Sequence, residues 1–266
     1  MNGSGVAAVV LAGGLGTRMR SERPKPIHML LGRRLVDWVA EAARSLEPDP
    51  LVIVSPPAFA QSFDGYDVAI QQEPLGTGHA VIAARSSLDG HEGDVIVLAG
   101  DAPLLRPETL RELLETHRSS DAAATVLTFT REDPGSYGRI VRGEDGTIRA
   151  IVEATDLGPE EQAITELNSS IYVFDAASLW PTLERLDPAN AQGELYLTDA
   201  VRMLVDDGAR VAAHEAEPGE AEGVNTRVEL AAAAAALRDR INEEHMLAGV
   251  TIVDPATTWI EPSVEL

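Results

Sequence analysis

Short apolar runs alternate with longer amphipathic stretches along most of this chain. That alternation is typical of an α/β fold, in which strands alternate with the helices that cover them. The apolar runs lack regular polar positions, which predicts strands buried on both faces, as in a mostly parallel sheet. The expected strands are residues 6–12, 51–55, 68–71, 94–99 and 123–130, and the expected helices are residues 34–46, 78–87 and 107–117.

The pattern changes in the second half of the chain. Short alternating segments between residues 137 and 174 flank the turn Glu144-Asp145-Gly146, which predicts a hairpin and therefore a mixed sheet. One long helix is expected from Thr226 to Leu247, built around six consecutive alanines. The acidic segment 214–222 before it is expected to be a solvated loop.

Length and charge narrow the class of protein. The 266 residues allow one large domain, or a domain plus a fragment. The 43 acidic residues outnumber the 21 basic ones, and a net charge of −22 repels nucleic acid and anionic membrane surfaces. We therefore expect neither as a partner.

The chain contains no cysteine, which excludes disulfides, thiolate metal sites and a cysteine nucleophile, and fits a reducing compartment such as the cytoplasm. No apolar run reaches 18 residues without a charge, and no basic segment precedes the first apolar run. We expect neither a membrane span nor a signal peptide.

The first chemical signal is the glycine-rich segment LAGGLGTR at residues 11–18, directly after an expected strand. Glycines there let the backbone turn tightly and present N–H groups to phosphates. The segment is not a Walker A loop, because no Gly-Lys-Ser/Thr closes it. A dinucleotide fingerprint is also disfavoured, since Met19 replaces its third glycine and Asp37 falls within a helix. A turn that only connects strand to helix is the alternative, and Arg18 argues against it.

Lys25 is the only lysine among the 21 basic residues. A lysine ammonium is a compact point charge, whereas an arginine guanidinium is a planar fork, and the two differ when a single phosphate oxygen must be met closely. Lys25 lies between Pro24 and Pro26, seven residues after Arg18. We interpret it as a phosphate ligand; the alternative is chance retention on a surface loop.

A second signal is the apolar strand 95–99 that ends in Gly100-Asp101. Ligands of open α/β sheets bind beyond the carboxyl ends of the strands, so Asp101 and the glycine-rich segment could face one crevice. A carboxylate there suits Mg²⁺, which needs only one or two protein oxygens beside phosphates and water. Asn225 is a candidate second ligand, although both residues could instead be helix N-caps.

Eight ordered segments together resemble the sugar nucleotidyltransferases, and in particular the N-terminal uridylyltransferase half of the bacterial bifunctional N-acetylglucosamine-1-phosphate uridylyltransferase/glucosamine-1-phosphate acetyltransferases. One glycine loop alone would be weak support, but the series spans nearly the whole chain. The segments are LAGGLGTRMRS with RPK (11–25), QQEPLGTGHA (71–80), AGDAPL (99–104), YGRI (137–140), IVE (151–153), LNSSIY (167–172), ELYLTD (194–199) and GVN (223–225).

The resemblance implies a Rossmann-like mixed, mostly parallel sheet and synthesis of UDP-N-acetylglucosamine and pyrophosphate from UTP and N-acetylglucosamine 1-phosphate. Arg18, Lys25 and Asp101 would be catalytic, and Asp101 with Asn225 would bind Mg²⁺. The remaining residues it implies are Leu11, Ala12, Gly13, Gly14, Gln71, Gly76 and Thr77 for the nucleotide, with Gln71 reading uracil, and Gly138, Glu153 and Asn168 for the amino sugar.

Three positions depart from the resemblance. Gly13 stands where this branch often has alanine, Ala99 replaces a frequent tyrosine, and Ser170 replaces a frequent glycine. These changes leave the phosphate and metal chemistry intact but leave the sugar open, so another sugar 1-phosphate is an alternative substrate. A non-catalytic nucleotide-sensing module is a further alternative, which the complete set of charged and metal-binding residues disfavours.

The resemblance also implies a division of the chain. Residues 1–226 would form the nucleotidyltransferase domain, residues 227–248 a connecting helix, and residues 249–266 the start of a left-handed β-helix. In the family that β-helix carries acetyl transfer and trimerisation. We therefore expect no acetyltransferase activity from these residues, and trimerisation only where a full β-helix is present.

The implied reaction needs no general base. A sugar 1-phosphate is mostly dianionic at neutral pH, because its second pKa is about 6. The difficulty is to bring one anion onto another, so positioning and electrostatic stabilisation should dominate. His79 is accordingly not assigned as a base.

Overall fold

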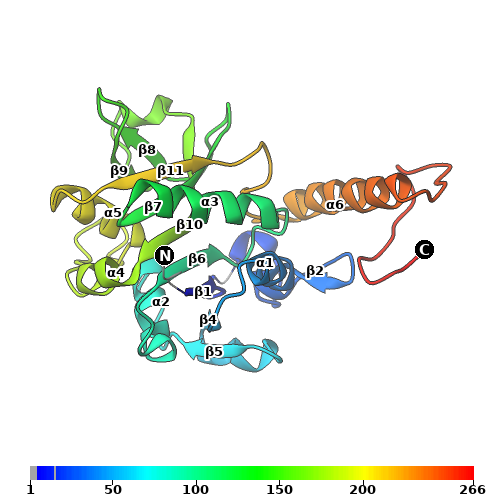
Figure 1. Cartoon of the computed structure of the whole chain (residues 1–266), viewed down its shortest axis with the longest axis horizontal. Helices are drawn as coiled ribbons and strands as arrows, with labels where there is room; N and C mark the ends of the chain where they lie inside the picture. Colours follow the sequence, from blue (N-terminus) through cyan, green and yellow to red (C-terminus); the bar gives the residue numbers. More distant parts are fainter. Residues whose placement is uncertain (1–4, 15) are drawn as a thin grey trace.

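A mixed sheet forms the centre of the molecule (Figure 1). The computed structural model describes residues 5–14 and 16–266, so Leu15 of the glycine-rich segment and residues 1–4 lie outside the described part. The strands are β1 (Val6–Leu11), β2 (Met29–Leu30), β3 (Arg33–Arg34), β4 (Leu51–Ser55), β5 (Asp67–Ile70), β6 (Asp94–Ala99), β7 (Ala124–Thr130), β8 (Arg139–Arg142), β9 (Ile148–Val152), β10 (Glu166–Asp175) and β11 (Val211–Glu215).

Within the described residues, nine of these strands form the main sheet, and β2 pairs with β3 separately. The main order is β11-β7-β10-β6-β1-β4-β5, and the hairpin of β8 and β9 joins at β10. Strand β10 is antiparallel to both β6 and β7, whereas the other neighbours along this path are parallel. The predicted mixed, mostly parallel sheet is confirmed.

Helices cover both faces of the sheet, which explains the continuous apolar runs. Alternate residues of β1 enter opposite cores: Ala7 and Val9 on one face, Ala8 and Val10 on the other, all without solvent exposure. A strand buried on both faces has no place for regular polar residues. The helices are α1 (Leu35–Arg44) and α3 (Pro107–Ser120) on one face, α2 (Thr77–Ala84), α4 (Ala176–Leu183) and α5 (Leu197–Asp206) on the other, with α6 (Arg227–Leu247) beyond the sheet.

The short 3-10 helices complete the described elements. Two of them follow β1: η1 (Thr17–Met19) carries Arg18 and η2 (Lys25–Ile27) carries Lys25. The others are η3 (Pro57–Ser62), η4 (Arg85–Leu88) and η5 (Glu161–Ala163).

The five predicted strands, the hairpin and the four predicted helices are confirmed to within a few residues. Helices α4 and α5 and strand β11 were not predicted.

The prediction that residues 214–222 form a solvated loop is correct only in part, since Glu215, Glu217 and Pro218 are exposed but other residues are not. The first two residues of this segment end β11, and Glu220 is only 5% exposed. The Glu220 carboxylate accepts a hydrogen bond from the Thr109 hydroxyl at 2.5 Å and lies 2.6 Å from the Arg106 guanidinium. The buried Glu220 carboxylate is stabilised because Arg106 balances its charge and Thr109 donates a hydrogen bond to it.

Helix α6 projects away from the sheet, and the C-terminal segment returns beside it (Figure 1). A capping box starts the helix, since the Thr226 side chain bonds the Glu229 backbone and the Glu229 side chain bonds the Thr226 backbone. The Asn242 side chain of α6 donates to the carbonyls of Pro255 and Thr258 in the returning segment, at 2.8 Å each. Residues 249–266 form turns without a strand, so the start of a β-helix there stays a prediction.

Among the described residues, no helix combines the length and apolar character needed to cross a membrane.

Asp37 has a structural role at the start of α1. Its carboxylate accepts two hydrogen bonds from the Arg34 guanidinium, at 2.8 and 2.7 Å, and one from the Arg34 backbone N–H at 3.0 Å. The Tyr66 hydroxyl donates a further bond at 3.0 Å. Burial raises the pKa of Asp37, but the bonds from Arg34 and Tyr66 outweigh it, so the pKa lies below its usual value. Asp37 therefore ends no dinucleotide fingerprint.

Replacing Asp37 with Asn should destabilise the fold by about 1–3 kcal/mol at neutral pH, because the charged partner of Arg34 is lost. A carboxylate with a lowered pKa stabilises the fold above the pKa it has when unfolded, and this contribution is lost as the pH falls through the folded-state pKa. Urea unfolding of parent and variant from pH 7 to pH 3 should thus show a difference that shrinks on acidification.

Glu41→Gln on the same helix is the matched control. Its pair with Arg44 is half-exposed, and such pairs contribute about 0–1 kcal/mol. A constant difference between Asp37→Asn and the parent at every pH would contradict the assigned ionic role.

Candidate active site

The carboxyl ends of the parallel strands bring the predicted segments to one edge of the sheet. The glycine-rich segment follows β1, Gln71 follows β5, and Asp101 follows β6. The Gly100 N–H donates to the Leu11 carbonyl at 3.0 Å, and a Cβ on Gly100 would lie 2.8 Å from that oxygen. Glycine at this position therefore lets the chain after β6 lie directly against the chain after β1.

A cavity of about 310 Å³ opens at this edge. Ala12 lies beneath it, buried at 1% exposure, with its N–H donated to the Val54 carbonyl at 2.9 Å. Eight of the predicted site residues line the cavity, namely Leu11, Gly13, Gly14, Lys25, Gln71, Gly76, Thr77 and Asp101, together with Pro26, Pro74, Ala80, Ala99, Ser170 and Glu194.

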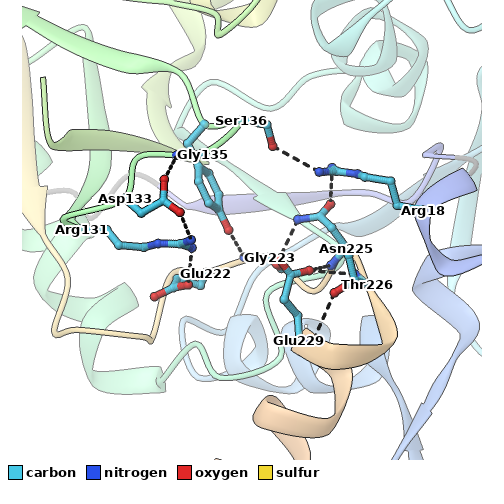
Figure 2. Close-up of polar contacts among 11 residues, drawn as sticks. Arg18, Arg131, Asp133, Gly135, Ser136, Glu222, Gly223, Asn225, Thr226 and Glu229 are labelled. Carbon is cyan, nitrogen blue, oxygen red and sulfur yellow. Dashed lines mark hydrogen bonds and ion pairs between the residues drawn. The ribbon is translucent and has the colours of Figure 1, made fainter. Parts of the chain in front are cut away.

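Cationic and oxygen-bearing side chains meet around Lys25 and Asp101, two residues of the cavity lining. The Lys25 ammonium donates to a carboxylate oxygen of Asp101 and, at 2.9 Å, to the side-chain oxygen of Asn225. The Arg18 guanidinium donates to the same Asn225 oxygen at 2.9 Å and to the Ser136 hydroxyl at 3.2 Å (Figure 2). The Lys25 and Asp101 side chains are only 14% and 17% exposed, which strengthens their attraction relative to bulk water.

The local backbone holds Lys25 in this position. Gly16 adopts a left-handed conformation, with φ of 61°, and a Cβ on it would lie 2.6 Å from the Lys25 Cβ. A larger residue would push Lys25 away, so Gly16 serves both the turn and the close approach. The low exposure of the Lys25 side chain argues against the alternative interpretation, a lysine retained by chance on a surface loop.

Neither candidate metal ligand is a helix N-cap. Arg106 precedes α3 and Thr226 caps α6, which removes the alternative interpretation of Asp101 and Asn225. The Val224 N–H donates to the Asp101 backbone carbonyl at 2.8 Å, so the segment before α6 is fastened to the segment after β6.

The oxygens of Asp101 and Asn225 suit a divalent cation. They are hard donors, and they already converge on one cation, the Lys25 ammonium. Among the described residues, no group of three or more histidine, aspartate or glutamate side chains is placed to hold a metal. A metal held here would therefore take its remaining ligands from phosphate and water.

A second set of cavity-lining groups surrounds Gln71. Gln71 is 6% exposed, and its side-chain nitrogen donates to the Gly76 carbonyl at 3.0 Å. Gly76 has a φ of 107°, and a Cβ on it would lie 2.6 Å from the Leu195 carbonyl. Thr77 begins α2, and its hydroxyl accepts the Leu197 N–H at 3.0 Å.

The predicted sugar residues form a third group beside the cavity. The Asn168 N–H donates to the Gly138 carbonyl at 2.9 Å, and the Asn168 side chain accepts the N–H of Ser170, a cavity-lining residue, at 3.1 Å. The Glu153 carboxylate accepts a bond from Thr198 at 3.1 Å. Burial raises the pKa of Glu153 above its usual value, with neighbouring carboxylates acting in the same direction.

Residues 8–204 match the MobA-like NTP transferase domain. The chain belongs to this family. It is 46% identical over 273 residues to the bifunctional protein GlmU of Mycobacterium tuberculosis (strain ATCC 25177 / H37Ra), covering 98% of this chain and 55% of that protein. The corresponding protein of Geobacter metallireducens is 48% identical over 263 residues, covering 96% and 55%, and that of Corynebacterium aurimucosum is 47% identical over 272 residues, covering 98% and 56%.

The predicted resemblance to nucleotidyltransferases is thereby confirmed, and the chain spans about half the length of the curated relatives it matches. Members of the NTP transferase family generally use a divalent metal, in agreement with the oxygen pair described above.

Tyr137 is a residue of this NTP transferase site to which the sequence assigned no role, although it precedes Gly138 in a quoted segment. Its hydroxyl accepts the Gly223 N–H at 3.1 Å, and the Gly223 carbonyl accepts the Asn225 side-chain N–H at 3.1 Å. Burial raises the pKa of Tyr137 to about 12, so the phenol stays protonated. The tyrosine thus helps to orient the Asn225 amide.

The structure shows the surroundings of two positions that depart from the family resemblance, Gly13 and Ser170. A Cβ on Gly13 would lie 3.0 Å from the Gln71 side-chain oxygen, so glycine leaves more room there than alanine. Ser170 has a φ of 62°, in the left-handed region where glycine is favoured, which fits the glycine frequent at this position. It lies in the register shift of β10 between Asn168 and Tyr172.

Proposed function

We propose that this chain is a uridylyltransferase that forms UDP-N-acetylglucosamine and pyrophosphate from UTP and N-acetylglucosamine 1-phosphate. One observation carries the proposal: Lys25 and Asp101 line the same cavity as Gln71 and the glycine-rich segment, and Asn225 contacts both Lys25 and Arg18. That arrangement suits a polyphosphate with a metal at one end and an uncharged base at the other.

In this proposal the nucleotide lies along the carboxyl edge of the sheet. Gln71 and the segment from Leu11 to Gly14 would contact uracil, and Gly76 and Thr77 would flank the base and ribose. Arg18 would bind the triphosphate, and Lys25 the phosphates nearest to the reacting phosphorus. Arg18 and Lys25 supply positive charge within a chain of net charge −22.

The amino sugar would bind next to this edge. Gly138, Glu153 and Asn168 would contact its hydroxyl and acetamido groups. Supporting this, Asn168 and Gly138 are joined by a backbone bond, and Ser170, two residues beyond Asn168, lines the cavity. The phosphate group of the bound sugar 1-phosphate would then approach Lys25 from the side of Gly138, Glu153 and Asn168.

Catalysis would rest on charge and position. The phosphate oxygen of the sugar attacks the α-phosphorus of UTP in line, a P–O bond forms, and the bond to the departing pyrophosphate breaks. Asp101 and Asn225 would hold Mg²⁺, which supplies Lewis-acid stabilisation of the phosphate charge. Arg18 and Lys25 neutralise the two approaching anions, and no protein base is required because the attacking oxygen already carries charge.

The proposed function also implies a cellular compartment, a biological role and a division of the chain. A chain without cysteine suits the reducing cytoplasm, where it would serve peptidoglycan synthesis and cell wall biogenesis. Residues 1–226 would carry the transfer reaction, residues 227–248 the connection, and residues 249–266 the start of a β-helix.

Pyrophosphate release across a matrix of nucleoside triphosphates and sugar 1-phosphates, with Mg²⁺, tests the proposal. We expect the highest kcat/KM for UTP with N-acetylglucosamine 1-phosphate. Higher efficiency with another sugar 1-phosphate would assign a different transferase specificity, and nucleotide binding without turnover for any pair would favour a sensing module.

Asp101→Asn should lower the rate on the order of a hundredfold or more, several kcal/mol of transition-state stabilisation, with the fold retained. The amide keeps the shape of the carboxylate but removes the charge that attracts a cation. Direct Mn²⁺ binding should weaken in parallel. Asp206→Asn on the exposed end of α5 is the matched control, and near-normal turnover by Asp101→Asn at saturating Mg²⁺ would refute the metal role.

Lys25→Arg should slow transfer, although this chain uses arginine at every other basic position, because a longer planar cation misplaces the charge between Pro24 and Pro26. An amine reagent offers a second test, since it can modify only Lys25 and the amino terminus. UTP with Mg²⁺ should protect Lys25 and preserve activity. Full activity after mass-confirmed modification of Lys25 would exclude it from the site.

A further inference from the structure

The amide nitrogen of the Gln71 side chain contacts two polar atoms of the protein. The nitrogen lies 3.0 Å from the Gly76 carbonyl oxygen and 3.3 Å from Nδ1 of His79. Gln71 is nearly fully buried, whereas His79 is partly buried in the first turn of α2. Both N–H groups of the amide are therefore used within the protein.

The hydrogen-bonding capacity of these two atoms fixes the orientation of the Gln71 side-chain amide. A carbonyl oxygen can only accept a hydrogen bond, so the atom opposite the Gly76 oxygen must be the Gln71 nitrogen. Nδ1 of His79 must then accept the second N–H, which places the ring proton on Nε2. A reversed amide would set its oxygen against the Gly76 oxygen, which cannot donate.

The remaining polar atom of Gln71 is its oxygen, on the side of the glycine-rich segment. A Cβ on Gly13 would lie 3.0 Å from this oxygen, and both residues line the cavity. Gln71 can thus offer the ligand an acceptor and no donor. Uracil carries an N–H at N3, whereas cytosine carries an unprotonated acceptor nitrogen there, so an acceptor favours uracil.

We propose that His79 is a specificity-determining positioning residue: its Nδ1 lone pair locks the Gln71 amide so that only the oxygen faces the nucleobase. The inference rests on the proposed use of UTP. His79 acts through Gln71 and takes no part in the chemical step, which agrees with its exclusion as a general base.

The test compares His79→Leu with His79→Asn. Leucine removes the acceptor, whereas the side-chain oxygen of asparagine lies near the position of Nδ1 and can accept the same bond. We expect the UTP/CTP ratio of kcat/KM to fall about three- to tenfold in His79→Leu, the range for loss of one uncharged hydrogen bond, and to stay within about twofold of the parent in His79→Asn. His91→Leu is the control, since His91 contacts the Asp94 carbonyl at the opposite end of β6.

A double-mutant cycle with Gln71→Ala identifies the route of the effect. Once Gln71 is alanine, His79→Leu should change the UTP/CTP ratio no further. An unchanged ratio in His79→Leu, an equal loss in His79→Asn, or a full additional loss in the Gln71→Ala background would each overturn the inference. A parent enzyme without preference for UTP would instead contradict the proposed function, and the role of His79 with it.

Discussion

The contact of the Lys25 ammonium with the oxygens of Asp101 and Asn225 is the interaction on which the rest of the site depends. It joins segments that lie 76 and 200 residues from Lys25 along the chain. Each segment is fastened by backbone bonds, from Gly100 to Leu11 and from Val224 to Asp101, so the geometry does not rest on flexible side chains alone. The cluster brings positive charge to a place where an acidic chain would otherwise repel phosphate.

Strand β10, which is antiparallel to its neighbours β6 and β7, brings further residues to the edge where the parallel strands end. Strands β1, β5 and β6 end at this edge, whereas β10 begins there because it runs in the opposite direction. Its first residues, including Asn168 and Ser170, therefore lie towards the carboxyl end of β6, where Ser170 lines the same cavity as Asp101. A purely parallel sheet would have placed these residues at the far edge.

Two groups of cavity-lining side chains are held by different interactions. Around Lys25 and Asp101, partly buried charges act at short range in a medium less polarisable than water. Around Gln71, a buried amide is held by neutral acceptors, and in the proposed function it would select the base because the wrong base would leave a polar group unpaired. Gly13, Gly16 and Gly76 serve this arrangement because a Cβ on each would press against Gln71, Lys25 or the Leu195 backbone.

The sequence by itself determined the α/β class, the glycine-rich segment after β1, the isolated Lys25, the Asp101 that follows β6 and Asn225 as a candidate second metal ligand, because strand periodicity and short motifs can be read along the chain. The resemblance added Gln71 and the sugar residues. Only the tertiary structure decided that Asn225 shares a cation with Asp101, that Tyr137 holds Gly223, and that Glu220 is buried against Arg106. These are pairings between segments distant in sequence, and each depends on a packing geometry that no local pattern encodes.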